Sequence, residues 1–280
     1  MSGHAMPGFA QKKLIQSRDN PFYKELVKLA GSARSRSKAG KTLLDGIHLL
    51  AAYLDAGLKP LHIILAAAAL KNDEITVLLL RLEDVPVTQL DDKLFAELSE
   101  LKTTTGILAL IDLPHTESST CHFALLLEDI QDPGNLGSML RSGAAAGCDA
   151  VFLSPGCADV WSPKVLRAAM GGHFCLNIFE DQDLSEVTAK FQGMRLAATL
   201  QAAISLYECD FTGDILFMIG NEGAGLSKAL LSCATHAVSI PMPGGIESLN
   251  AASAAAICLF EAVRQKLTTP ASIYRPGRGV

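Results

Sequence analysis

Residues 127–141 of this chain are LEDIQDPGNLGSMLR, the end of an apolar strand followed by a Gly/Pro/Asn loop and the start of a helix. Two later stretches follow the same pattern, IGNEGAGLS at residues 219–227 and IPMPGGIESLNAA at residues 240–252. In open α/β sheets, ligands bind outside the carboxyl ends of the strands, where such loops meet. Three polar loops of this kind predict one composite site and indicate an enzyme.

The composition is that of a globular protein. Of the 280 residues, 49% are apolar and 19% are charged, which is enough to form buried cores and too apolar for a disordered chain. The first residues show no basic segment followed by an apolar one, so no secretory signal is expected. Apolar runs such as residues 63–70 are much too short to span a bilayer. The sequence therefore favours two domains, a cytoplasmic location and no membrane partner.

Neither cysteine nor histidine is spaced for a metal site. The seven cysteines are scattered and form no C-x-x-C pair, and the seven histidines form no H-x-x-x-H pattern. Zinc sites and disulfide frameworks need closer, paired spacing. We therefore expect reduced, mostly buried thiols and no metal.

Positive charge is concentrated near the N-terminus. The net charge is −5, yet residues 12–41 carry nine basic side chains against two acidic ones, a local net charge of +7, so the rest of the chain carries −12. Such asymmetry indicates a binding surface for a polyanion. The alternative is a solvated helix face with a basic tail. The candidate nucleic-acid contacts are Lys12, Lys13, Arg34, Arg36, Lys38 and Lys41.

An alternating α/β unit precedes a polar linker. Asn20 and Pro21 predict the start of a helix that ends at Gly31, and the polar, basic residues 32–41 predict a mobile stretch. The strands expected after it are 43–44, 61–65, 85–88 and 107–111, with helices at 46–57, 73–82 and 93–101. Residues 1–112 then form a first domain, and residues 113–121 form a linker.

Residues 122–280 alternate more regularly and predict a parallel sheet. The expected strands are 124–127, 151–153, 196–199, 215–219 and 237–240, and the expected helices are about 135–146, 163–169, 184–192, 227–233 and 249–267. Unbroken apolar runs such as Ala124–Leu127 and Ile215–Ile219 are typical of strands buried on both faces. The fold class is therefore α/β in both domains.

The first loop offers backbone N–H groups and a cation. A Pro-Gly turn precedes Asn135, which can cap the helix that follows. Arg141 lies six residues later, near the start of the helix, where the helix dipole makes a cation unfavourable. This placement suggests a function such as phosphate binding. The alternative is an exposed arginine paired with Glu128 or Asp129, and the segment alone does not separate the two.

The second and third loops lack the signatures of common nucleotide sites. Residues 220–225 are glycine-rich but have no P-loop lysine and no G-x-G-x-x-G register, so an NAD-dependent oxidoreductase, the alternative enzyme class, is a poor match. Glu222 would repel phosphate and instead suits hydroxyl or ammonium groups. Ser248 is either a helix N-cap or, with Asn250, a pair of hydrogen-bonding groups for a ligand beside the helix start.

Together the three segments resemble the three signature motifs of the SpoU/TrmH family of RNA ribose 2′-O-methyltransferases. The matching residues are Asp-Pro-Gly-Asn-Leu-Gly with an arginine six residues after the asparagine, Gly-Asn-Glu-Gly, and Ile-Pro-Met before Ser-Leu-Asn. The first domain is similar to the family's substrate-binding domain, related to ribosomal protein L30e, through residues 44–50 and the basic helix after Asn20. The resemblance implies a C-terminal α/β trefoil-knot (SPOUT) methyltransferase domain preceded by a smaller L30e-like domain.

The resemblance also implies a cofactor, a partner and an assembly, which are S-adenosyl-L-methionine, structured RNA and a homodimer with the site close to its interface. The implied cofactor-binding residues are Thr199, Leu200, Gly220, Asn221, Gly223, Ile240, Met242 and Leu249. The family's polar catalytic positions correspond to Asn135, Arg141, Glu222, Ser248 and Asn250.

The implied reaction transfers a methyl group to a ribose 2′-hydroxyl. Ribosomal RNA is the expected substrate, because a separate binding domain suits a large structured target, and transfer RNA is the alternative. An arginine is a poor base at neutral pH, so we expect Arg141 to orient the hydroxyl and stabilise charge, with Asn135 fixing its pose. A non-catalytic RNA-binding or ribosome-assembly protein of the same fold is the other alternative.

Overall fold

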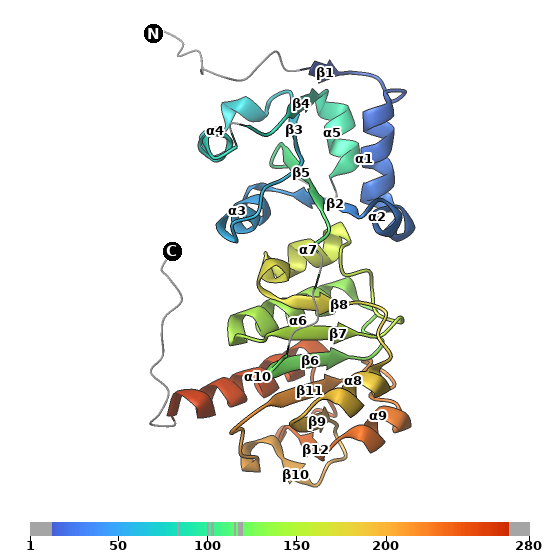
Figure 1. The fold of residues 1–280 in the computed structure, drawn as a ribbon, viewed down its shortest axis with the longest axis vertical. Helices are drawn as coiled ribbons and strands as arrows, with labels where there is room; N and C mark the ends of the chain where they lie inside the picture. Colours follow the sequence, from blue (N-terminus) through green and yellow to red (C-terminus); the bar gives the residue numbers. More distant parts are fainter. Residues whose placement is uncertain are drawn as a thin grey trace. The chain divides into compact units, whose positions relative to one another are not determined.

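The computed structural model describes residues 13–82, 84–99, 101, 104–114, 116 and 120–268, and the chain forms two compact units (Figure 1). The first unit combines the described residues before Thr116 with Trp161–Phe174, and the second combines Thr116–Val160 with the described residues from Cys175 onward. None of the helices in these described ranges is long and apolar enough to cross a membrane. Whether residues 113–121 act as a linker stays a prediction.

The first unit is built on a mixed five-stranded sheet. Its strand order is β1 (Lys13–Ile15), β4 (Val87–Leu90), β3 (His62–Ala66), β5 (Ile107–Asp112) and β2 (Lys41–Asp45). The strand β5 runs antiparallel to both of its neighbours, and the other pairs are parallel. The strand β2 therefore lies at one edge of this sheet.

The helices of the first unit follow the expected order, with two additions, α2 and η1. They are α1 (Pro21–Gly31), α2 (Ala33–Ala39), α3 (Ile47–Asp55), the 3-10 turn η1 (Ala69–Lys71), α4 (Asp73–Leu80) and α5 (Asp92–Leu98). The predicted start of α1 is confirmed, because the side chain of Asn20 accepts hydrogen bonds from the backbone N–H groups of Phe22 and Tyr23 at 2.9 and 3.3 Å.

The prediction of a mobile stretch at residues 32–41 is wrong, because α2 lies there. Ser32 caps this helix by accepting from the backbone N–H of Ser35, and the helix ends at Gly40, whose φ of 62° is accessible to glycine at little steric cost. Arg36 is only 5% exposed. The sequence did not predict α2 because the side chain that this helix buries is the charged Arg36, so the segment has no apolar pattern.

The segment Trp161–Phe174 belongs to the first unit although the residues on both sides of it belong to the second. It contains α7 (Pro163–Ala169), which packs against β2, and the 3-10 turn η2 (Gly172–Cys175) follows. Thr42 on β2 donates a hydrogen bond from Oγ1 to the carbonyl of Trp161 at 2.9 Å. The rings of Tyr53 and Phe174 meet edge to face, with their centroids 4.9 Å apart.

The second unit is built on a seven-stranded, wholly parallel sheet. Its order is β10 (Ile204–Ser205), β12 (His236–Ser239), β9 (Met194–Ala198), β11 (Ile215–Ile219), β6 (Phe123–Leu127), β7 (Ala150–Leu153) and β8 (Asn177–Phe179). The five strands that the sequence predicted are confirmed. The strands β8 and β10 were not predicted, because three and two residues are too few to show a periodicity.

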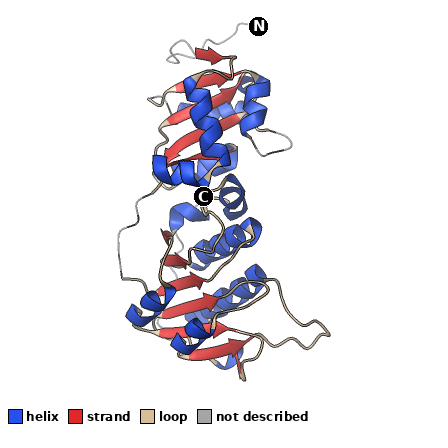
Figure 2. Cartoon of the chain, turned by 90° about the vertical axis from the view of Figure 1, so that its right-hand side faces the viewer, coloured by secondary structure: helices blue, strands red, loops and turns tan. Residues whose placement is uncertain are grey.

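Helices cover both faces of this sheet (Figure 2). The helices are α6 (Pro133–Ala146), α8 (Leu184–Lys190), the 3-10 turn η3 (Leu206–Glu208), α9 (Lys228–Cys233) and α10 (Ala251–Thr268). The helices α8 and α9 pack on the face that carries Leu126 and Met218. The helix α6 packs on the other face, where Gly143 lies against Leu125, and α10 packs along α6. This arrangement brings the starts of α6 and α10 to the edge where the strands end.

Candidate active site

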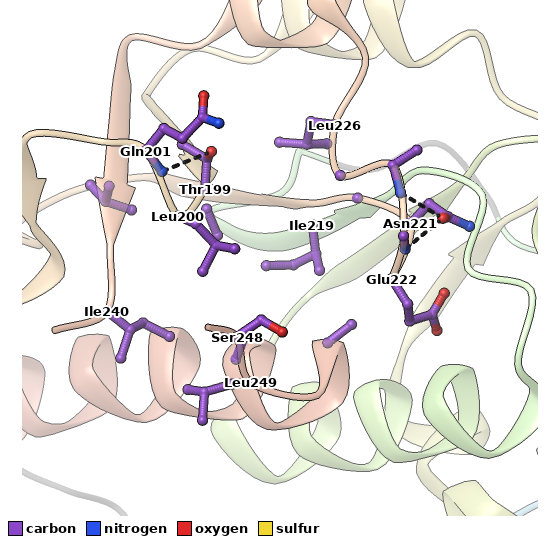
Figure 3. A pocket seen from close by; sticks show the side chains of 18 of the residues that line it. Thr199, Leu200, Gln201, Ile219, Asn221, Glu222, Leu226, Ile240, Ser248 and Leu249 are labelled. Atoms are coloured by element: carbon purple, nitrogen blue, oxygen red, sulfur yellow. Dashed lines mark hydrogen bonds between the residues drawn. The ribbon is translucent and has the colours of Figure 1, made fainter. Parts of the chain in front are cut away.

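A pocket of about 370 Å³ lies in the second unit, where β9, β11 and β12 end. Its volume is in the range of small-molecule sites. Leu200 and Ile240 border it on one side and Glu222 on the other (Figure 3). All eight of the sequence-predicted cofactor residues line it: Thr199, Leu200, Gly220, Asn221, Gly223, Ile240, Met242 and Leu249. The structure therefore brings together three loops that lie apart in sequence.

The loop after β11 folds tightly back on itself. A Cβ atom on Gly220 would lie 2.2 to 2.4 Å from backbone atoms of Gly225 and Leu226, so no larger side chain fits there. The side chain of Asn221 accepts from the backbone N–H groups of Gly223 and Ala224 at 2.9 and 3.1 Å (Figure 3). Its own backbone carbonyl accepts from the N–H of Gly225 at 2.9 Å. These bonds fix the wall of the pocket.

Residues directly after β6 hold this loop from outside. The Glu128 carboxylate accepts from the backbone N–H of Ser227 at 2.7 Å, and Asn221 Nδ2 donates to the carbonyl of Asp129 at 2.9 Å. Sequence reasoning missed this support for the loop. The available signal was the acidic residue Glu128 at the end of a buried strand, because its carboxylate is the group that accepts from Ser227.

Three of the predicted catalytic side chains form one hydrogen-bonded chain. Asn250 Nδ2 donates to Asn135 Oδ1 at 2.9 Å, and Asn135 Nδ2 donates to Glu222 Oε1 at 2.7 Å. Both ends of the Asn135 amide are therefore used. Glu222 also lines the pocket, so the chain connects the starts of α6 and α10 to the pocket wall.

Two helix caps differ from those that the sequence suggested. The N-cap of α6 is Asp132, whose side chain accepts from the backbone N–H of Asn135 at 2.8 Å. At the start of α10, it is Asn250 whose side chain accepts from the N–H groups of Ala252 and Ser253 at 3.0 and 3.2 Å. Asn135 and Ser248 were the expected caps. Their side chains are thereby left for the site, and Ser248 lines the pocket.

The charges of the site are unevenly placed. Among the described residues that line the pocket, Glu222 is the only acidic or basic one, so the pocket favours a ligand that carries positive charge. Arg141 does not line the pocket; it is exposed on α6. Within the described part of the chain it makes no hydrogen bond or ion pair, so the suggested pairing with Glu128 or Asp129 is not found.

The side chains that the sequence predicted as nucleic-acid contacts differ in their exposure to solvent. Arg34 and Lys38 are exposed on α2, and Lys41 is half-buried at the start of β2. The prediction for Arg36 is wrong, because its guanidinium is buried and Nη1 donates to the carbonyls of Leu29 and Ala30 at the end of α1. Lys12 and the side chain of Lys13 lie outside the described residues.

The two buried cysteines of the described residues, Cys148 and Cys258, lie away from the pocket. No group of three or more His, Cys, Asp or Glu side chains in the described ranges is arranged to hold a metal ion. Burial raises the pKa of Cys148 and of Cys258 to about 12, so both stay protonated thiols at neutral pH. Neither residue lines the pocket.

Comparison with known proteins gives consistent similarities for both parts of the chain. Residues 122–260 match the SpoU rRNA Methylase family, and residues 20–109 match an MRM3-like substrate binding domain. An uncharacterized tRNA/rRNA methyltransferase of Synechocystis is 34% identical over 90% of this chain and 94% of its own length. The 23S rRNA (guanosine(2553)-2′-O)-methyltransferase RlmP of Bacillus subtilis is 33% identical over 89% of this chain and 98% of its own length.

Solved structures show the same likeness. The SpoU methyltransferase AviRb from Streptomyces viridochromogenes, in complex with AdoMet, has a TM-score of 0.79 at 28% identity and covers 89% of this chain and 99% of that chain. The structure of an RNA 2′-O ribose methyltransferase has a TM-score of 0.78 at 29% identity, with coverage of 91% and 99%. The similarity therefore extends across both units.

Proposed function

Because this chain belongs to the SpoU rRNA methylase family, we propose that it transfers the methyl group of S-adenosylmethionine to a ribose 2′-hydroxyl of structured RNA, with ribosomal RNA as the substrate. The predicted fold class is confirmed: a C-terminal α/β trefoil-knot methyltransferase domain follows a smaller α/β substrate-binding domain. The chain is an enzyme, and S-adenosylmethionine is its cofactor.

One observation carries the assignment of the site. All eight predicted cofactor residues line the pocket, and so do Glu222 and Ser248. Glu222 accepts a hydrogen bond from Asn135, and Asn135 accepts one from Asn250. Four of the five predicted catalytic residues thus form one site with the cofactor residues. This convergence supports the roles carried over from the family, and Arg141 is the remaining residue.

The groups that line the pocket suit S-adenosylmethionine. Leu200, Ile240 and Leu249 offer apolar surface for an adenosyl group, and the backbone of residues 220–225 offers hydrogen-bonding groups. Glu222 offers the negative charge that a sulfonium or an ammonium group requires. When bound, the cofactor supplies a methyl group that is already activated by its positive sulfur.

The chain's own residues then have to align the ribose 2′-hydroxyl with the methyl group and assist the loss of the hydroxyl proton. Asn135 and Asn250 hold the Glu222 carboxylate in one orientation, so it presents a fixed acceptor at the pocket wall. Ser248 adds a hydroxyl that can donate and accept. An arginine side chain has hydrogen-bond donors and no acceptor, so the role of Arg141 is to orient the ribose and stabilise the charge that develops on oxygen as the proton leaves.

The substrate class follows from the same argument. Reaction at a 2′-hydroxyl confines the enzyme to RNA, and relatives in Bacillus subtilis and Streptomyces viridochromogenes are named as 23S rRNA 2′-O-methyltransferases. Arg34 and Lys38 on α2 are exposed cations for the RNA backbone. These observations favour ribosomal RNA over transfer RNA.

We also propose that the protein forms a homodimer through α10. Phe260 and Leu267 on α10 are 47% and 52% exposed, and large apolar side chains at a surface mark association sites when they cluster. Light scattering on the purified protein is expected to give twice the mass of one chain, and a Phe260→Asp variant to shift the protein towards monomer. A monomer for the unaltered chain would refute the homodimer and leave the proposed reaction untouched.

The cytoplasmic location stays a prediction.

The first experiment measures cofactor binding. Purified protein is titrated calorimetrically with S-adenosylmethionine and, separately, with NAD. We expect saturable binding of the first and none of the second. Binding of NAD alone would instead support an oxidoreductase and overturn the proposal.

The second experiment measures methyl transfer. The protein is incubated with tritiated S-adenosylmethionine and protein-free large-subunit rRNA, tRNA or DNA of matched length. We expect label in rRNA at a position that resists alkaline cleavage, because a methylated 2′-oxygen cannot attack the adjacent phosphate. Label in tRNA alone would favour the tRNA alternative. Cofactor-dependent label at an alkali-labile position would contradict ribose methylation, and RNA binding without transfer would indicate a non-catalytic protein.

A further inference from the structure

The helix α7 belongs to the first unit. Both α7 and the basic helix α2 pack against the edge strand β2. The carbonyl of Trp161, just before α7, accepts a hydrogen bond from Thr42 in the middle of β2 at 2.9 Å. A segment that follows β7 of the catalytic sheet is therefore fixed to the edge strand that directly follows α2.

Each of these two helices presents a pair of cations on one face. Arg34 and Lys38 are four residues apart on α2 and both are exposed. Lys164 is exposed and Arg167 half-buried, three residues apart on α7. Side chains at these spacings are neighbours on a helix surface, where like charges destabilise the helix slightly. Lys38 and Arg167 lie in the last turns of their helices, where the helix dipole favours a cation, but this effect does not account for Arg34 and Lys164.

These four cations also lack acidic partners within the described residues, where the structure gives none of them an ion pair or a side-chain hydrogen bond. Lys41 differs, because it lies opposite Asp112 in the ladder between β2 and β5, so we leave it out of this set. We call Arg34, Lys38, Lys164 and Arg167 the α2/α7 basic surface.

Several other cations of the first unit are paired with carboxylates, whereas Lys28, Lys71 and Lys93 are single exposed lysines without an ion pair within the described residues. Arg18 pairs with Glu97, Lys24 with Asp19, Lys59 with Asp84 and Arg81 with Asp55. These pairs lie on α1, α3, α4, α5 and their loops. The cations of α2 and α7 differ from these single lysines because they occur as neighbouring pairs on two helices that contact one strand.

We propose that the α2/α7 basic surface binds the phosphate backbone of the substrate RNA, and that Lys164 and Arg167 of α7 are RNA contacts supplied by the catalytic half of the sequence. This inference rests on the proposed function, because it assumes an RNA substrate. Cations on two helices that contact one strand suit an extended polyanion, whose phosphates are contacted without regard to base sequence. Such contacts position the RNA and do not select the nucleotide.

The test replaces each pair of cations with neutral side chains. The variants are Lys164→Gln/Arg167→Gln and Arg34→Gln/Lys38→Gln. A matched control, Lys71→Gln/Lys93→Gln, removes the same charge from two exposed lysines of the first unit that have no ion pair within the described residues. Affinity for protein-free large-subunit rRNA is measured from 0.05 to about 0.3 M salt, and S-adenosylmethionine binding is measured by calorimetry.

We expect each α2 or α7 double variant to bind rRNA on the order of ten- to thirty-fold more weakly near 0.15 M salt. The slope of log affinity against log salt should fall by about 1.5, because two phosphate contacts are lost. The control should stay within about two-fold of the unaltered protein, and cofactor affinity should be unchanged in all variants. The charge-preserving variant Lys164→Arg/Arg167→Lys should retain RNA affinity.

Two results would overturn this inference while leaving the proposed function intact. One is a Lys164→Gln/Arg167→Gln variant that binds RNA like the Lys71→Gln/Lys93→Gln control. The other is a loss of RNA affinity in Lys164→Arg/Arg167→Lys as large as in the neutral variant, which would show a structural role for α7. An unaltered protein that binds neither rRNA nor tRNA would refute the proposed function itself.

Discussion

Asn135 donates a hydrogen bond of 2.7 Å from Nδ2 to Oε1 of Glu222, although 87 residues separate them in sequence. Because Asn135 Oδ1 accepts from Asn250 at the same time, this amide fixes the orientation of the carboxylate that lines the pocket. A carboxamide is required here, since it must donate at one end and accept at the other.

We expect Asn135→Asp to be more harmful than Asn135→Ala. The aspartate would place a second carboxylate against Glu222, whereas alanine only removes the hydrogen bond. Loss of a hydrogen bond to a charged group corresponds to about 1.5 to 3 kcal/mol, so kcat/KM should fall on the order of ten- to a hundred-fold for alanine. Methyl-transfer kinetics on Asn135→Ala, Glu222→Ala and the double variant provide the check. Additive losses in free energy would contradict coupling between the two residues.

We expect Arg141→Ala to lose activity and keep the cofactor. Arg141 lies outside the pocket lining and makes no bond within the described chain, so S-adenosylmethionine affinity should stay within about two-fold. A charge-stabilising donor typically contributes on the order of a hundred-fold or more to kcat. Single-turnover methyl transfer and calorimetry measure the two effects separately. Full activity in this variant would refute the assigned role.

We expect Gly220→Ala to disrupt the pocket. The added methyl group would lie 2.2 to 2.4 Å from the backbone at Gly225 and Leu226, so the loop has to move. Overpacking of this kind costs about 1 to 3 kcal/mol, and cofactor affinity should fall at least ten-fold. The matched control is Gly244→Ala, since a Cβ at Gly244 meets no atom within 4 Å. Equal cofactor affinity in both variants would show that the loop tolerates the clash.

The pairing of Glu261 and Arg264 on α10 predicts a pH dependence of stability. Arg264 donates two hydrogen bonds to the buried Glu261 carboxylate at 2.8 and 2.7 Å and holds the pKa of that carboxyl below its usual range. The stabilisation is therefore fully present above the pKa of the unfolded chain, about 4.3. It is lost as the pH falls through the lower pKa of the folded state.

The variant Glu261→Gln tests this dependence. Its free energy of unfolding should be about 1 to 2 kcal/mol below that of the unaltered protein near pH 7, and the difference should shrink below about pH 4. Urea unfolding between pH 3 and 8 measures both. The variant Glu25→Gln, at an exposed glutamate on α1, is the control and should show little change. A deficit that persists unchanged at pH 3 would contradict an ionic origin.

The strands that were predicted and the strands that were missed differ in burial. The strands β6 and β11 are unbroken apolar runs that are buried at every residue, and such runs are readable from sequence. The strands β8 and β10 are short and lie at the two edges of their sheet, where burial imposes no pattern. The helix α2 was missed for the opposite reason, because its buried side chain is Arg36.

By itself the sequence determined the chemistry of the three loops: the glycine at 220, the carboxylate at 222, the amides at 135 and 250, and the family to which they belong. Only the tertiary structure decided which of them meet. The strand β11 pairs with β6 so that Ile219 lies opposite Leu127, and this register places the loops after both strands together. It also decided that Asp132 and Asn250 cap the helices, that Arg36 is buried, and that α7 joins the first unit. Contacts between segments this far apart depend on strand register and packing, which local composition does not encode.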